Sequence, residues 1–592
     1  MPSRWRPTAG EFVLLLLLFG FLAALHLFQL EADPPGAVQR HFLTDEGWWA
    51  HDARLHYLFG SWSPDDHNVA LIWAPLYTGT LRLVFEITGE GLVPLRLLSV
   101  ASGLATCLWV FGFVRVWHGR RAAFFATLLF GTHFFTITHH RIGYPETFQA
   151  LFVATALLCT MAAAYRPGWA VVAGLSFACA LLAKISALWV AAPLAAFWLV
   201  HYRTAGQAGW PPFRWSALVL FATSVAAVAG AVGLFLVLPH TEVFEVAVGR
   251  RVSIAGAENP ILGLAQLGLH HGFPVGDIRA SGFIRQSPVL LSCLLITLLV
   301  GAVGAGDRRG SRWGTTIRRG GSSRLGACSR LEAMSWCWLV AGLVVIGTEV
   351  LPPDRRFLAL TPALCILVAI SLVEGRIAVP ARSARGHLYG TAALGLALGA
   401  GVLLGLVLRG GLAEWIRSTL EVGRASASLL AWVAFVAAAM VLVPPLLQRL
   451  PSRRVPIPAA VVLAGFLALN LGRFGWALAH PHYTVRDASA QIADVTRNWP
   501  AGERAIVGDA ADTLALGSGQ FAFLIRSWEH KGMFMNLDGW ERFDPWLVLG
   551  EAPDRPGFEA LPSLELAPGV DGVPRFTIPM HVRTEPRPGS AQ

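Results

Sequence analysis

The sequence predicts an all-α polytopic membrane protein that ends in a small exported α/β domain. Of its 592 residues, 54% are hydrophobic and only 14% are charged, whereas a soluble domain carries about 25% charged residues. Apolar runs long enough to cross a bilayer recur from residue 11 to residue 476, and only the sequence after them is a polar mixture. These observations predict a transmembrane domain at residues 1–476 and a soluble α/β domain at residues 477–592.

The apolar runs predict about 13 transmembrane helices. The first, residues 11–30, follows Arg4 and Arg6 and is too long for the apolar part of a typical signal peptide, so its amino terminus is predicted to be cytoplasmic. The other predicted spans are residues 94–117, 122–138, 147–165, 168–183, 185–200, 215–238, 288–305, 333–351, 357–373, 388–408, 427–447 and 455–476. A run at residues 74–87 contains Arg82 and Glu86 and is assigned to the membrane surface.

Loop charges support this count, because cytoplasmic loops of membrane proteins are enriched in basic residues. The predicted spans place the Arg-rich loop at residues 307–330 inside, and one more span at residues 74–87 would put it outside. The same rule accounts for the net charge of +10 without a nucleic-acid partner. The predicted exported regions are therefore residues 31–73, residues 239–287 and all residues after 476. The basic residues are almost all arginine, which is typical of GC-rich bacterial genes and indicates a bacterial plasma membrane.

The exported carboxyl-terminal part has the pattern of a small α/β domain. Residues 484–499 are amphipathic with a helical period, and residues 504–509, 521–528 and 545–549 are short apolar runs bounded by Gly or Pro. The seven cysteines all lie in predicted spans or in the basic loop, so no disulfide framework or CxxC metal site is expected.

The first exported loop contains the most unusual polar segment, Asp45-Glu46 followed by Trp48-Trp49. Acidic residues are scarce in the apolar segments, and Trp residues favour the depth of the lipid headgroups. The spacing of Asp45, Trp49 and Asp52 would put polar groups on one face of a helix along the membrane surface. The alternative is an ordinary helix cap with acids in the first turn.

Three further groups are candidates for the same face. His140 and Glu146 lie in a short outer turn and could bind a metal ion, or they form an ordinary polar turn. Lys184 at the outer end of a span could bind phosphate, or it reaches for the interface as lone lysines do. Arg356, in the turn at residues 352–357, could bind a phosphate through two N–H groups of its guanidinium. Arg250 is a weaker candidate for the same role, and the alternative for it is ordinary contact with a lipid headgroup. Together they offer a carboxylate base for a hydroxyl and cations for a lipid phosphate.

In these segments the chain resembles the GT-C class of integral-membrane glycosyltransferases, in particular the bacterial group of aminoarabinose transferases and protein O-mannosyltransferases. The resemblance covers residues 11 to about 373 in order, and its carriers are Asp45-Glu46-Gly47, Ala74-Pro75-Leu76-Tyr77, Arg96-Leu97, the segment from His140 to Glu146, Leu182-Ala183-Lys184, Arg356-Phe357-Leu358 and Pro362-Ala363-Leu364. After residue 373 only the general layout is similar.

The resemblance implies an inverting glycosyltransferase that uses a polyprenyl-phosphate sugar outside the membrane. Asp45 would be the general base for the acceptor hydroxyl of a lipid, glycan or protein, a contribution of about 10²–10⁴-fold in rate. Lys184 and Arg356 would stabilise the lipid phosphate as it leaves. Glu46, Glu146 and His140 are assigned to positioning the acceptor or a divalent metal ion, and no nucleotide or organic cofactor is expected.

The sequence also departs from this family. Trp73-Ala74 stands where the aminoarabinose transferases have a lysine, and Glu146 stands where relatives usually have Asp. Two other functions remain open. A transporter or flippase of a lipid-linked glycan would favour polar groups at mid-membrane and paired repeats, which the sequence does not display. A structural or assembly protein would leave the grouping of acids and cations unexplained.

Overall fold

The structure is a computed structural model of the chain. It describes residues 8–33, 40–60, 62, 70–205, 211–241, 287, 289–291, 293–294, 322–347, 354–374, 378–380, 454–456, 459–479, 481, 483–500, 504–508, 511–524, 545–549, 558–566 and 576–583. The predicted spans at residues 388–408 and 427–447 and most of that at 288–305 lie outside the described residues.

The all-α polytopic membrane fold is confirmed. Seven helices of the described part are long and apolar enough to cross a membrane, or eight if one bent pair is a single span. They are α1 (Ala9–Leu27), α5 (Leu92–His118), α8 (Pro145–Ala163), η1 (Ile185–Val190) with α10 (Ala191–Thr204), α11 (Trp215–Val232) with η2 (Gly233–Val237), η6 (Asp354–Leu360) with α17 (Thr361–Val373), and α20 (Ala459–Ala479). The shorter apolar helix α9 (Trp169–Ala183) coincides with a predicted span, and helix α16 (Ser322–Gly347) overlaps another. Helix α16 begins earlier than the predicted residue 333, inside the Arg-rich loop.

The bent pair replaces one predicted span, residues 122–138. Helices α6 (Arg120–Gly131) and α7 (Phe134–His140) meet at an angle of 62°. A kink needs a local cause, and here the side chain of Asn470 on α20 accepts a hydrogen bond from the backbone N–H of Phe134 at 2.8 Å. This bond satisfies a donor that the broken helix frees, so α7 can turn away from the axis of α6.

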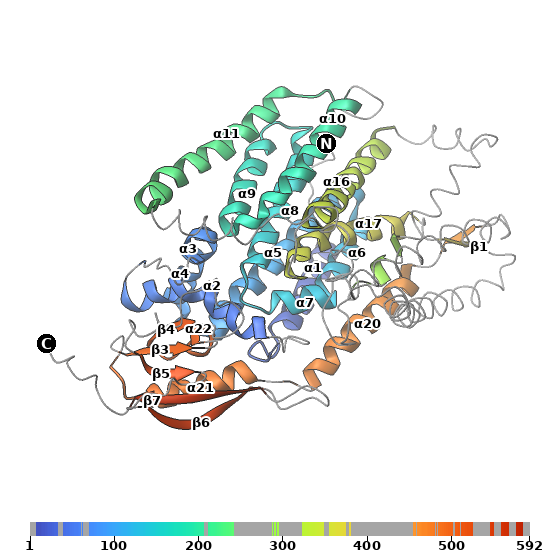
Figure 1. Ribbon diagram of the computed structural model, residues 1–592. Coiled ribbons are helices and arrows are strands. Elements are labelled where there is room, and N and C mark those ends of the chain that lie inside the picture. Colours follow the sequence, from blue (N-terminus) through green and yellow to red (C-terminus); the bar gives the residue numbers. More distant parts are fainter. Residues whose placement is uncertain are drawn as a thin grey trace, which may run out of the picture.

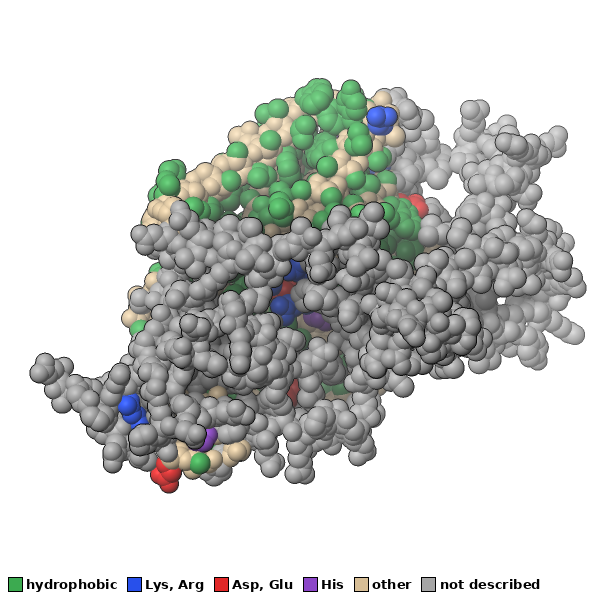
Figure 2. All heavy atoms as spheres, in the orientation of Figure 1, with side chains coloured by type: hydrophobic (Ala, Val, Ile, Leu, Met, Phe, Trp, Pro, Cys, Tyr) green, Lys and Arg blue, Asp and Glu red, His purple; other side chains and the backbone are tan. Residues whose placement is uncertain are grey.

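Burial separates a central layer from a lipid-facing rim. Over 18-residue windows of α8 and of the η6–α17 span, 83% and 89% of the residues are buried, compared with 17% in α1. In α11 the buried residues are Ala217 and Ser224. Figure 1 shows α11 standing at the outside of the helix bundle, and Figure 2 shows apolar side chains over this part of the molecule. Apolar exposure on these outer helices is what a membrane protein needs.

Three helices of the first loop lie between the membrane helices and the carboxyl-terminal sheet (Figure 1). They are α2 (Arg40–Phe59), α3 (Ala70–Trp73) and α4 (Pro75–Thr88). Helix α4 has only 14 residues and was not found among the helices that could cross a membrane, in line with its assignment to the membrane surface. Their buried side chains, among them Trp49, Tyr77 and Phe85, form one apolar cluster with Leu95 of α5.

The carboxyl-terminal part has a mixed five-stranded sheet with strand order β4-β3-β5-β7-β6. Its elements are α21 (Thr484–Thr496), β3 (Ala505–Gly508), α22 (Ala511–Leu514), β4 (Phe521–Leu524), β5 (Pro545–Leu549), β6 (Phe558–Leu566) and β7 (Phe576–Arg583). Strand β3 pairs in parallel with β4 and β5, whereas β7 runs antiparallel to β5 and β6. The predicted helix and strands fall on α21, β3, β4 and β5. Strands β6 and β7 were not predicted, because each contains a proline, which is rare inside a strand. A two-stranded ribbon of β1 (Ala378–Pro380) and β2 (Arg454–Pro456) was not predicted either.

Candidate active site

Helix α2 carries the first-loop acids, and it is helical over Arg40–Phe59. Asp45 belongs to this helix, but its side chain lies outside the described side chains. The next residue, Glu46, is fully buried. The side-chain contacts of α2 are therefore described from Glu46 onwards.

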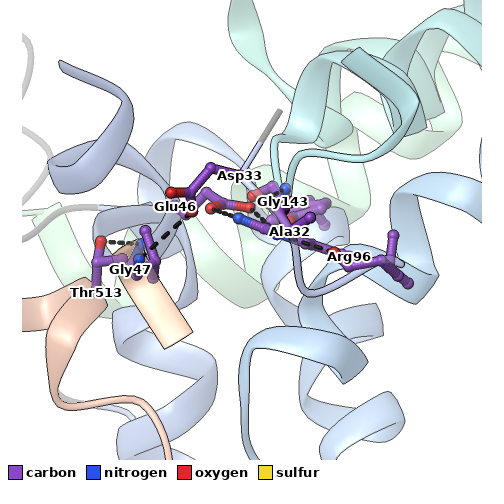
Figure 3. Close-up of polar contacts among 10 residues, drawn as sticks. Ala32, Asp33, Glu46, Gly47, Arg96, Gly143 and Thr513 are labelled. Atoms are coloured by element: carbon purple, nitrogen blue, oxygen red, sulfur yellow. Dashed lines mark hydrogen bonds and ion pairs between the residues drawn. The ribbon is translucent and has the colours of Figure 1, made fainter. Parts of the chain in front are cut away.

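Glu46 forms a fully buried, two-pronged ion pair with Arg96 of α5. Arg96 Nε lies 3.0 Å from Glu46 Oε1 and Arg96 Nη2 lies 2.9 Å from Oε2, and neither side chain is exposed. The backbone N–H of Gly143, in the turn between α7 and α8, also donates to Glu46 Oε1 at 2.6 Å. Figure 3 shows the contacts of Glu46 with Arg96 and Gly143. Planar forks of this kind fix orientation as well as distance, so Glu46 holds α2 against α5 and this turn.

Two arginines hold the chain that follows α1. Besides Glu46, Arg96 donates through Nη1 to the carbonyls of Leu30 and Ala32, at 2.9 Å each. Arg141 donates to the carbonyl oxygens of His26, Phe28 and Gln29. The last carbonyls of a helix have no partner within it, so Arg141 caps α1 and starts the first loop at the site.

The first turn of α8, the end of α9 and the start of η6 bring an acid and cations together. Lys184 Nζ lies 2.6 Å from Glu146 Oε1, and Arg355 Nε lies 2.7 Å from the same oxygen. Both Glu146 and Lys184 are buried. The other oxygen, Glu146 Oε2, is buried without a hydrogen-bond partner among the residues that the structure describes. Figure 2 shows basic, acidic and His side chains together in the middle of this face.

Lys184 lies at a break between two helical segments. Helix α9 ends at Ala183, Lys184 has extended backbone angles, and η1 begins at Ile185. Gln149 of α8 donates to the Lys184 carbonyl at 2.6 Å, which satisfies an acceptor at this break. The ammonium also lies 4.1 Å from the centre of the Trp49 ring of α2, within the range of a cation–π interaction. The break therefore turns the Lys184 side chain towards both α8 and α2.

Burial lowers the pKa of Lys184 to about 7, although the Glu146 carboxylate opposes the shift. The guanidinium groups of Arg355 and Arg356 lower this pKa further. Among the described side chains of this group, Lys184, Arg355 and Arg356 give three positive charges against one on Glu146, so 3 − 1 leaves an excess of two when Lys184 is protonated. A phosphate monoester, which carries about −1.5 to −2 charges at pH 7, matches this excess.

The chain is similar to known membrane proteins in sequence and in fold. Residues 73–240 match the family described as dolichyl-phosphate-mannose-protein mannosyltransferase. The crystal structure of ArnT from Cupriavidus metallidurans in the apo state is similar, with a TM-score of 0.54 and 16% identity over 96% of this chain and 98% of that chain. The same protein bound to undecaprenyl phosphate gives a TM-score of 0.54 and 17% identity over 97% and 98%. The chain has the GT-C fold. None of the curated protein sequences matches it.

Within the GT-C fold, the predicted site residues separate into two groups. Glu146 and Lys184 meet, and Arg356 lies close enough to affect the charge of Lys184. His140 does not join them: its Nδ1 lies 3.2 Å from Nε2 of His26 on α1. Arg250 lies outside the described residues. Among the residues that the structure describes, no three His, Cys, Asp or Glu side chains are grouped as a metal site.

Two contacts in this part of the structure were not identified as such from the sequence. Arg355, the neighbour of the candidate Arg356, contacts Glu146, and residue spacing cannot choose between adjacent arginines. Arg96 was noted only as part of a motif, yet it is the partner of Glu46. The signal available in the sequence was an arginine near the start of an apolar span, since a charge there requires a partner.

Proposed function

We propose that the protein is an inverting glycosyltransferase that moves a sugar from a polyprenyl-phosphate donor to an acceptor hydroxyl at the outer face of a bacterial plasma membrane. The observation that carries this proposal is the group formed by Glu146, Lys184 and Arg355, with its excess of positive charge next to helix α2. The GT-C fold and the match to a mannosyltransferase family support it. So does the undecaprenyl phosphate bound by the similar ArnT structure.

The proposed reaction needs two opposite electrostatic tasks. The acceptor hydroxyl must lose its proton as its oxygen attacks the anomeric carbon, and Asp45 on α2 takes that proton as general base. The bond from the anomeric carbon to the phosphate oxygen breaks, and the departing phosphate gains negative charge. Lys184, Arg355 and Arg356 stabilise that charge because they are already in place before the reaction.

Glu146 and Glu46 have different tasks in this proposal. Glu146 holds Lys184 and Arg355 through one oxygen, and its second oxygen, Oε2, is an acceptor for a hydroxyl of the sugar or the acceptor. Glu46 is engaged by Arg96 and Gly143, so we assign it to holding α2, and Asp45 with it, rather than to binding the acceptor.

Mass spectrometry of lipids that copurify with the protein tests the donor class. A polyprenyl phosphate or its glycosylated form is expected, and its absence together with no binding of added undecaprenyl phosphate would refute the proposal.

The role of Asp45 as general base is tested in cells that lack the protein and are complemented with a variant. Asp45→Asn should be inserted normally but should not restore the missing sugar on envelope lipids, glycans or proteins. Glu86→Gln, which changes an exposed acid of α4, is the control. Full restoration by Asp45→Asn removes Asp45 from the mechanism.

The purified protein also distinguishes a transferase from a flippase. A flippase would move a labelled lipid-linked sugar across vesicles made with the pure protein, without any transfer to an acceptor. Sugar loss from the carrier, dependent on added acceptor, is the result expected for the transferase.

A further inference from the structure

The carboxyl-terminal part touches helix α2 directly, next to the residues assigned to the site. The backbone N–H of Gly47 donates to Thr513 Oγ1 at 2.8 Å. His51 Nδ1 lies 3.4 Å from Asp512 Oδ1, and both side chains are buried. Figure 3 shows Thr513 reaching Gly47, adjacent to Glu46. Residues more than 460 positions apart thus share one buried contact.

Gly47 is needed for this close approach. A Cβ at residue 47 would overlap the backbone of Asp512 and Thr513. Glycine is a poor residue for the middle of a helix because it loses more backbone entropy than alanine. Its presence within α2 is explained by the backbone that lies against it.

A second attachment lies about two turns beyond Gly47 along α2. Arg54 donates through Nη2 to the carbonyl of Ala515 at 3.1 Å and to Ser518 Oγ at 3.3 Å. It also pairs with Glu90, which in turn accepts from the backbone N–H of Gly519 at 3.2 Å. The segment at residues 511–519 is therefore fixed along one side of α2.

The other contacts of α2 lead into the site. Glu46 binds Arg96 and Gly143, and the Trp49 ring covers the ammonium of Lys184. Any rotation or shift of α2 would move Trp49 relative to Lys184. The membrane helices hold α2 on one side and residues 511–519 hold it on the other.

We propose that Asp512 and Thr513 are positioning residues of the proposed transferase, through which the carboxyl-terminal part sets the place of α2 and thereby the phosphate-binding group. This inference rests on the proposed function. It assigns the carboxyl-terminal part a task in binding the lipid phosphate, without a contact of its own to that phosphate.

The experiment compares Gly47→Ala with Gly79→Ala in the full-length protein. Gly79 is also within a helix, α4, but nothing lies within 4 Å of an added Cβ there. Two properties are measured in detergent: hydrogen exchange of the α2 peptides without ligand, and the affinity for undecaprenyl phosphate. Gly47→Ala should increase exchange in α2 and weaken binding by about 5- to 10-fold, the scale of one lost hydrogen bond. Gly79→Ala should change neither property.

A second pair of variants tests the contact from the other side, in case Gly47→Ala does not fold. Thr513→Val removes the hydroxyl that accepts from Gly47 and keeps the shape, whereas Thr513→Ser keeps the hydroxyl. Valine should reproduce the loss of affinity, and serine should restore at least half of it. A purely structural contact would change exchange or thermal stability and leave the affinity unchanged, and this result overturns the inference.

Failure of the inference differs from failure of the proposed function. If the unaltered protein binds undecaprenyl phosphate and the Gly47 and Thr513 variants bind it equally well, only the positioning role is refuted. If the unaltered protein does not bind it, the proposed function fails and the inference fails with it.

Discussion

Glu46→Gln is the sharpest test of how the membrane domain holds helix α2. The substitution keeps the shape and removes the carboxylate that pairs with the fully buried Arg96, while the charge of Asp33 nearby and the bonds to the Leu30 and Ala32 carbonyls remain. Removing one partner of a buried ion pair costs about 3–5 kcal/mol. Because two carbonyls still accept from Arg96, we expect the lower end, about 3 kcal/mol, or roughly a 100-fold change in the unfolding equilibrium.

The assay is equilibrium unfolding in mixed micelles titrated with SDS and followed by tryptophan fluorescence. Glu86→Gln is the matched control, because Glu86 pairs with Arg82 on the exposed side of α4, where such a pair contributes about 0.5 kcal/mol. Adding Arg96→Met to Glu46→Gln should recover part of the loss, since the unpaired charge is then removed. A cost below about 1 kcal/mol for Glu46→Gln would refute the reasoning that this pair is buried and unscreened.

Two further predictions concern the charge of Lys184 and the packing of α5. With a pKa near 7, the Lys184 side chain is protonated below pH 7 and loses its charge as the pH rises. If only the protein with protonated Lys184 binds undecaprenyl phosphate, the affinity should fall about tenfold for each pH unit above 7. Lys184→Arg should show a weaker pH dependence, and equal slopes would contradict the assigned role. Gly103→Ala should destabilise the protein by about 1–3 kcal/mol, because its Cβ would overlap the His140 ring. Gly112→Ala on the same helix has open space and should be neutral or stabilising by up to about 1 kcal/mol. Thermal unfolding in detergent compares the two, and equal effects would contradict the packing.

The membrane helices were predictable because each carries its own signal. A run such as residues 94–117 is apolar over its whole length, and lipid leaves a helix as the only form that satisfies its backbone. The bend between α6 and α7 was not predictable, since its cause is the side chain of Asn470, which lies more than 300 residues away. The same holds for strands β6 and β7, which pair with each other across a sequence that carries proline and charge.

The candidate site was predictable in its composition but not in its pairing. Acids and cations on outer turns indicated that Glu146 and Lys184 would meet, and they do. Glu46 was assigned to the acceptor, yet Arg96 and Gly143 occupy its oxygens. His140 is packed against His26 because α7 is turned towards α1. Which side chains pair depends on how the helices pack against one another, and residue spacing along separate helices does not give that packing.

The contact between Gly47 and Thr513 also sets an order in time. Ribosomes add about 5–20 residues per second, so the 466 positions between the two residues correspond to roughly 25–90 s of synthesis. Helices α3 to α8 are made in the first part of that interval, after which Glu46 can meet Arg96, but the last support of α2 does not yet exist. A nascent chain therefore has most of its membrane domain before its site is complete. The support of α2 is completed only when Asp512 and Thr513 have been made.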